Sequence, residues 1–227
     1  MNQDRVLEAF RQEAAALTHA VSGLSPAEWS LPTRCTPWSV LDLLGHVCVV
    51  IDWLPDMLEA PAPDKPEISA AEYYRPDDRF SPRTNDTRIT LAQDRAARSA
   101  DGAAFAEEFA ATWQRVDRLC RVQAAGRTVR TRHGDAMLLS EFLLTRVVEV
   151  AVHGLDLADA LGHDPWLTPS AADVVTELLL GADRTGAVPA LGWSQARFLR
   201  KATGRETLDE AEAERIEQLG LRWLALG

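Results

Sequence analysis

Apolar residues recur at helical spacing through most of this chain, and hardly any segment alternates between apolar and polar residues. This pattern predicts amphipathic α-helices, because a half-buried β-strand needs alternation. The clearest stretch is 140–161, SEFLLTRVVEVAVHGLDLADAL, which we expect to be capped by Ser140 and to end before Gly162. With 46% hydrophobic residues in a chain of 227, one large core can form. We therefore predict an all-α helical bundle.

The same spacing, together with cap residues followed by proline, predicts the other helices. They cover 2–21, a short piece from Ser25, 36–54 with Thr36 as its cap, about 87–100, 103–123, 168–180, 193–203 and 207–219. Proline-rich segment 60–85 is predicted to be a long loop, 127–132 an extended piece, 133–135 a turn and 181–192 a loop. We place a bundle over 1–165 and a helical extension packed on it over 166–227.

Charge and hydropathy exclude several kinds of partner. The formal net charge of −10 argues against nucleic acid and anionic membranes, because both need clustered Lys and Arg. No apolar run reaches 18 residues, and the first residues lack the features of a secretory signal, so we expect a cytoplasmic protein. The cysteines Cys35, Cys48 and Cys120 are far apart, which predicts neither a disulfide framework nor a thiolate zinc site.

One constellation can hold a metal ion. Glu149 and His153 are four residues apart on a predicted helix, so their side chains can converge on one point. If the helix containing His46 packs against them, two imidazoles and one carboxylate form a catalytic type of site with an open position. Asp42, one turn earlier, could orient the His46 ring. Spacing alone leaves two ordinary interpretations open. Glu149 and His153 could lie in solvent on the polar face of a surface helix, and His46 could be a hydrogen-bonded histidine of the core.

Two long segments resemble a known family. Segment 29–47, WSLPTRCTPWSVLDLLGHV, and segment 146–162, RVVEVAVHGLDLADALG, are similar to the two motifs of the mycothiol-dependent maleylpyruvate isomerase family, within the DinB-like superfamily. The resemblance implies a DinB-like four-helix bundle, here with additional short C-terminal helices. It also implies a metal, usually zinc, held by His46, Glu149 and His153, and mycothiol as co-substrate.

Further residues are assigned with this resemblance in view. The family often carries a C-terminal α/β domain with a catalytic arginine, but residues after Gly162 are predicted here to be helical. Arg205 is a candidate counterpart, or an ordinary charge beside a helix end. The remaining assignments are Trp38 and Arg146 in substrate binding, and Asp42 and Asp156 as residues that support the metal ligands.

Two functions are carried forward. The first is an enzyme that activates mycothiol, or a similar thiol, for attack on a small electrophile, as an S-transferase or a cis–trans isomerase. The second is a non-catalytic module that binds a small ligand or a partner chain, with 60–85 as its contact surface. The sequence does not determine the electrophile, the metal or the oligomeric state, and it is compatible with a homodimer.

Overall fold

The computed structural model describes residues 2–226 and confirms the predicted all-α fold. The α-helices are α1 (Gln3–Val21), α2 (Pro26–Trp29), α3 (Val40–Ile51), α4 (Trp53–Glu59), α5 (Ala70–Tyr73), α6 (Pro82–Ala96), α7 (Gly102–Arg121), α8 (Leu139–Leu161), α9 (Pro169–Leu180), α10 (Ala187–Ala190), α11 (Gln195–Ala202) and α12 (Glu210–Gln218). Two 3₁₀ turns, η1 (Asp78–Phe80) and η2 (Ala182–Arg184), join them. Strands β1 (Thr128–Arg130) and β2 (Ala136–Leu138) form an antiparallel hairpin around the predicted turn.

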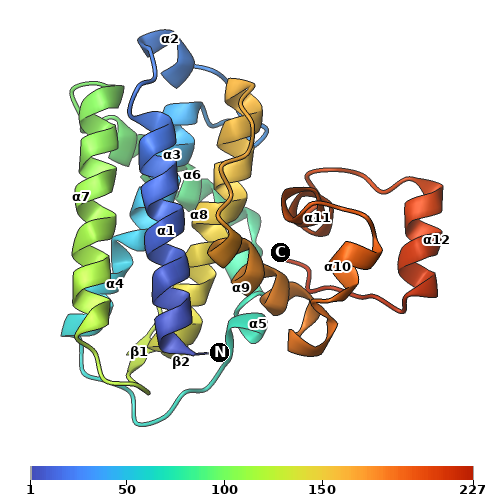
Figure 1. Ribbon diagram of the computed structural model, residues 1–227. Helices are drawn as coiled ribbons and strands as arrows, with labels where there is room; N and C mark the ends of the chain where they lie inside the picture. Colours follow the sequence, from blue (N-terminus) through green and yellow to red (C-terminus); the bar gives the residue numbers. More distant parts are fainter. Residues whose placement is uncertain (1, 227) are drawn as a thin grey trace.

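Four long helices, α1, α3, α7 and α8, stand side by side and enclose the core (Figure 1). Helix α6 packs along α3, and α9 packs against α1 and α8. The predicted apolar face of α1 is confirmed, because Val6, Phe10, Ala14 and Leu17 have no exposed surface. Burial of four such side chains on one stripe fixes which side of the helix faces its neighbours.

Helix α3 begins later than predicted. Its cap is Ser39 rather than Thr36: the Ser39 hydroxyl accepts from the Asp42 N–H, and the Asp42 carboxylate accepts from the Ser39 N–H. This reciprocal capping box satisfies two backbone donors, which a helix extended back to Thr36 would not achieve. The helix ends at Ile51, and Pro55 lies in the first turn of α4, where its missing N–H costs nothing.

Three other predictions of boundaries are wrong. Segment 60–85 is not one loop, because it contains α5 and η1, and α6 starts at Pro82 behind the Ser81 cap. Likewise, 181–192 contains η2 and α10. Ser140 does not cap α8, since strand β2 runs directly into the helix and Leu138 occupies the cap position. At its other end α8 stops at Gly162, as predicted, in a left-handed conformation with φ of 68°.

Gly45 sets how closely α3 and α6 approach. A Cβ placed at this position would lie 2.5 Å from the backbone oxygen of Ala92 and 3.4 Å from the Cβ of Ala96. Only glycine permits this approach, because the neighbouring atoms are the backbone of Ala92 and the Cβ of Ala96, and neither can turn aside as a long side chain can. The next residue in α3 is His46, so this packing also fixes the helix that carries one of the predicted metal ligands.

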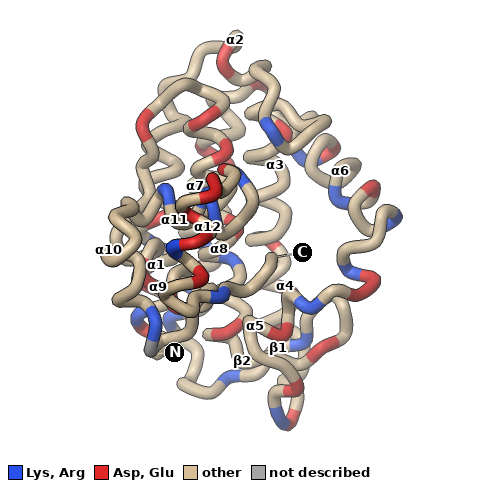
Figure 2. Tube along the Cα trace, turned by 90° about the vertical axis from the view of Figure 1, so that its right-hand side faces the viewer, with Lys and Arg blue, Asp and Glu red and all other residues tan. Residues whose placement is uncertain are grey.

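The helices after residue 166 contact the bundle through α9 and α11, while α10 and α12 lie further out at the side (Figure 1). From that side, basic and acidic residues lie intermingled over most elements (Figure 2). None of the described helices is long and apolar enough to cross a membrane. The division at residue 165, and the absence of nucleic-acid partners, stay predictions.

A buried carboxyl joins α1 to the start of α9. Glu13 has no exposed surface, and its Oε2 accepts hydrogen bonds from the backbone N–H and the hydroxyl of Thr168, at 2.8 and 2.6 Å. Its Oε1 has no hydrogen-bond partner within residues 2–226. Burial raises the pKa of Glu13 to about 7, although the two bonds from Thr168 oppose the rise.

The raised pKa makes the stability of the fold depend on pH. Below about pH 4.5 both the folded and unfolded chains carry a protonated Glu13, so its contribution is complete. Above that pH the unfolded chain ionises first, and stability is lost as the pH rises through about 7. We expect Glu13→Gln to gain about 3 kcal/mol relative to the wild type between pH 4.5 and pH 8, measured by urea unfolding. Glu59→Gln, at an exposed carboxyl, controls for the lost charge, and parallel pH profiles for Glu13→Gln and the wild type would contradict the prediction.

Candidate functional site

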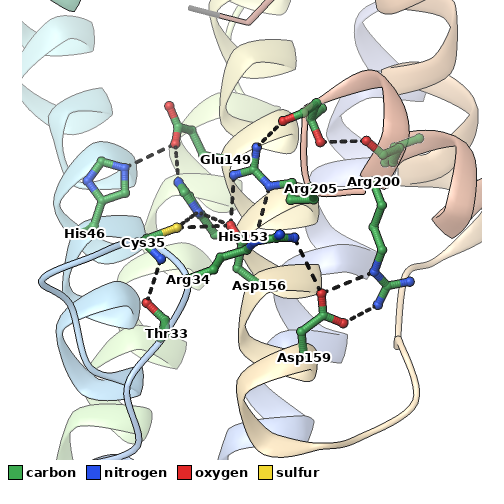
Figure 3. Close-up of polar contacts among 12 residues, drawn as sticks. Thr33, Arg34, Cys35, His46, Glu149, His153, Asp156, Asp159, Arg200 and Arg205 are labelled. Atoms are coloured by element: carbon green, nitrogen blue, oxygen red, sulfur yellow. Dashed lines mark hydrogen bonds and ion pairs between the residues drawn. The ribbon is translucent and has the colours of Figure 1, made fainter. Parts of the chain in front are cut away.

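Helices α3 and α8 bring the three predicted metal ligands together. His46 Nε2 lies 3.2 Å from Glu149 Oε2, and His153 Nε2 lies 3.4 Å from the same oxygen. The two imidazole rings meet edge to face with centroids 5.1 Å apart. Figure 3 shows both histidines directed toward the same Glu149 carboxylate. Spacing alone had left open whether the two helices meet, and the packing of α3 on α8 settles that geometric question.

The protonation of these groups follows from their surroundings. Burial lowers the pKa of His46, which favours its neutral, ligand form. Burial alone would raise the pKa of Glu149, but hydrogen bonds with His153 and His46 hold it well below its ordinary value. Burial alone would also lower the pKa of His153, but contacts with Asp156, Cys35 and Glu149 raise it. A cation at Nε2 would compete with that proton.

This donor set fits a divalent metal. Two imidazole nitrogens and one carboxylate oxygen, all lying within 4.8 Å of one another, are the ligand types that zinc takes in catalytic sites. The other nitrogen of His153, Nδ1, lies 2.9 Å from Asp156 Oδ2. A hydrogen on Nδ1 bonded to that carboxylate leaves the Nε2 lone pair directed at Glu149, as in histidines that ligate metals.

Asp156 also joins the site to the C-terminal segment. It is 1% exposed, and its two carboxylate oxygens accept from Arg205 Nε and Nη2 at 3.0 and 2.9 Å. Burial alone would raise the pKa of Asp156, but His153 and Arg205 hold it well below its ordinary value. Arg205, predicted as a catalytic residue, therefore contacts the carboxylate that contacts His153, a predicted metal ligand, and it also lines the pocket.

The site forms one wall of a pocket of about 360 Å³. Trp38 stacks on His46 with centroids 4.8 Å apart and lines the pocket, while its part in substrate binding stays a prediction. Arg146 is only 1% exposed, donates to the backbone oxygen of Val50 and lies 3.7 Å from Glu149 Oε1. Its side chain also lines the pocket, so both residues can meet a bound molecule.

The structure places Asp42 differently from the prediction. Its carboxylate accepts from the backbone N–H and the hydroxyl of Ser39, at 3.0 and 2.7 Å, and so belongs to the capping box of α3. The described contacts of Asp42 are with Ser39 and not with His46. Aspartate three residues after a serine is the ordinary pattern of a helix start, and that simpler interpretation accounts for this residue.

Several residues in the pocket or beside the candidate metal ligands were missed by the sequence reasoning. Cys35 donates to Asp156 Oδ2 at 3.4 Å and lies 4.0 Å from His153 Nδ1, so Cys35, His153 and Asp156 form a second group with metal-ligand chemistry. Tyr74, which directly follows α5, and Arg88, in α6, line the pocket. Cys35 lies within segment 29–47, the first of the two family-like motifs, and that membership was a sequence signal that could have placed it near the site. Nothing in the sequence pattern directs Tyr74 or Arg88 toward His46.

Asp156 offers a test of how the ring of His153, a predicted metal ligand, is held in its orientation. We expect Asp156→Asn to weaken metal binding about 10- to 100-fold, because His153 loses the carboxylate that fixes its tautomer. A competition titration with a chromophoric zinc chelator measures this affinity. The same exchange at Asp159, which pairs with Arg200 nearby, is the matched control. Unchanged zinc affinity in Asp156→Asn would show that His153 needs no such support.

Together these features define a helical-bundle protein with a His–Glu–His group in the wall of a pocket. The chain belongs to the family of the mycothiol maleylpyruvate isomerase N-terminal domain, whose model matches residues 10–158.

Solved structures show the same fold. The crystal structure of the mycothiol-dependent maleylpyruvate isomerase has a TM-score of 0.60 and 17% identity, covering 91% of this chain and 90% of that one. A histidine-to-alanine mutant of that isomerase matches with the same TM-score and coverage, at 16% identity. This coverage means that the likeness continues past residue 158 into the C-terminal helices. No curated protein matches the chain.

Proposed function

We propose that this protein is a metal-dependent enzyme that uses mycothiol, or a similar low-molecular-weight thiol, to attack a small electrophile. The observation that carries the proposal is the convergence of His46, Glu149 and His153 in the wall of the pocket. Membership of the isomerase family favours cis–trans isomerisation as the reaction, and S-transfer is the second candidate. Zinc is the cation that best fits two imidazoles and a carboxylate.

The residues of the chain have distinct tasks in this proposal. A divalent cation supplies a charge that favours thiolate over thiol at neutral pH. His46, Glu149 and His153 would hold it, and Asp156 keeps the His153 ring oriented. Trp38 covers one face of His46 and shields it from water. Arg205 holds Asp156 as an anion and presents positive charge at the pocket wall.

The chemistry then depends on the electrophile. A thiolate sulfur adds to one carbon of a conjugated double bond, and the displaced electron pair moves onto the carbonyl oxygen. The former double bond rotates as a single bond, and reversal expels the thiolate, so the thiol is regenerated. With a leaving group on the electrophile, the S–C bond is kept and one thiol is consumed.

This difference gives the experiment. Purified protein is analysed for metal and then incubated with mycothiol and cis-acetylacrylate, or with an alkyl halide. An isomerase forms the trans product with no net loss of thiol, and a transferase consumes one thiol per product. Chelator-treated protein is the control for metal dependence. Bound metal with neither reaction over a broad panel of electrophiles would favour the non-catalytic module instead.

The location of the protein belongs to the same proposal. All three cysteines are free thiols, and an enzyme that uses a low-molecular-weight thiol needs a reducing compartment. We therefore propose that the protein is cytoplasmic and comes from an actinobacterium, the kind of organism that contains mycothiol.

A further inference from the structure

Tyr74 lines the pocket and carries a buried hydroxyl. The side chain is 6% exposed and lines the pocket together with His46, Glu149 and Arg146. Its hydroxyl oxygen is buried and has no hydrogen-bond partner among the described residues. Leaving such a group unsatisfied costs about 1–3 kcal/mol, so a phenylalanine at this position would be the more stable choice. A costly donor beside an active-site pocket indicates that a ligand completes its hydrogen bonding.

The surrounding structure holds the Tyr74 ring in place. Its ring packs edge to face on Tyr73, with centroids 5.6 Å apart. It follows α5 directly, and this short helix is fixed by the capping box of Ser69 and by a bond from the Ala70 N–H to Glu141. The hydroxyl is therefore positioned before any ligand arrives, which avoids an ordering cost on binding.

The charges around the hydroxyl indicate what kind of molecule fits. Burial, and then the nearby Glu149 carboxylate, raise the pKa of Tyr74, so it remains an O–H donor. Arg88 lines the same pocket, and its described hydrogen bond goes to the backbone oxygen of Arg79 rather than to a carboxylate. Arg132 stacks on Trp53, 4.5 Å from its centroid, close enough to Arg88 and Arg146 for their charges to act on it. This excess of cations suits a ligand with a carboxylate.

We propose that Tyr74 is a catalytic residue whose hydroxyl donates a hydrogen bond to the carbonyl oxygen of an unsaturated keto acid in the pocket. This inference rests on the proposed function. When the thiolate sulfur bonds to the alkene carbon, the electron pair moves to that oxygen, and the Tyr74 O–H stabilises the resulting enolate without giving up its proton. When the enolate collapses and the S–C bond breaks, the same bond weakens again. No oxidant or further reactant is needed.

Tyr74→Phe tests this assignment, because it removes one oxygen and nothing else. We expect the kcat for isomerisation of cis-acetylacrylate to fall about 100-fold with a smaller change in KM, as for loss of one oxyanion donor. We expect the Kd of levulinate, a saturated keto acid that cannot react, to rise about fivefold by tryptophan fluorescence. The melting temperature should stay the same or rise, whereas a structural tyrosine would lose stability.

The matched control is Thr176→Val in α9. Thr176 is also a buried hydroxyl without a described partner, but it does not line the pocket. Its removal should leave levulinate binding and isomerisation unchanged. Equal levulinate affinity in the wild type and Tyr74→Phe, or no levulinate binding by the wild type, would overturn the inference. An inactive wild type that binds levulinate through Tyr74 would instead refute the proposed reaction and keep the donor assignment.

Discussion

His46→Ala is expected to lose its bound metal and to reduce thiol-dependent activity about 1000-fold or more. The variant keeps two of the three proposed ligands, Glu149 and His153, which come from one helix and no longer face a donor from α3. A metal contributes several kcal/mol to transition-state stabilisation, and about 1.4 kcal/mol corresponds to a factor of ten in rate. Elemental analysis and a thiol-dependent rate assay on the same preparation measure both effects.

Two variants keep this experiment decisive. His163→Ala changes an exposed histidine beyond the end of α8 and should retain full metal content and activity. Glu149→Gln preserves the volume of a proposed ligand side chain, so its loss of metal cannot be ascribed to a cavity. Full metal occupancy in His46→Ala would show that the ligand set is wrong, whatever the activity.

Gly45→Ala is expected to destabilise the fold by about 3 kcal/mol, at the upper end of the range for overpacking. The added Cβ would meet the Ala92 backbone oxygen at 2.5 Å, and a helix backbone cannot move aside as a side chain can. For a chain of this size the melting temperature should fall by about 6–12 °C. Gly23→Ala is the control, since a Cβ there meets nothing within 4 Å. Equal melting temperatures for the two variants would mean that α6 shifts at little cost.

Local patterns in the sequence predicted those features that depend on residues close together in the chain, such as which side chains share one face of a helix. The four-residue spacing of Glu149 and His153 was sufficient to direct both side chains to one point, and the apolar stripe of α1 was sufficient to define its buried face. The pairing with His46 depends on how α3 packs on α8, which spacing cannot express. The resemblance to the isomerase family supplied that long-range information.

The remaining differences between prediction and structure have two causes. Either two local sequence patterns compete for the same helix start, or the position of a side chain depends on how a loop folds. Thr36 and Ser39 both resemble caps, and the reciprocal bonds of Asp42 decide for Ser39. The Asp42 carboxylate is bonded to Ser39 in that cap, so the geometry does not support the prediction that Asp42 orients the His46 ring. Tyr74 reaches the pocket only because α5 folds within a segment whose prolines predicted a loop.

The Asp156–Arg205 pair divides the site between two stretches of sequence. The proposed cation ligands lie within the part that the family model covers, whereas the guanidinium that pairs with the Asp156 carboxylate comes from beyond it. In the proposed enzyme, the residues that hold the metal and the arginine at the pocket wall would thus be encoded in separate parts of the gene. Exchange of the C-terminal part would then change the pocket wall while the three proposed ligands were retained, provided that the new part still supplied a cation to Asp156.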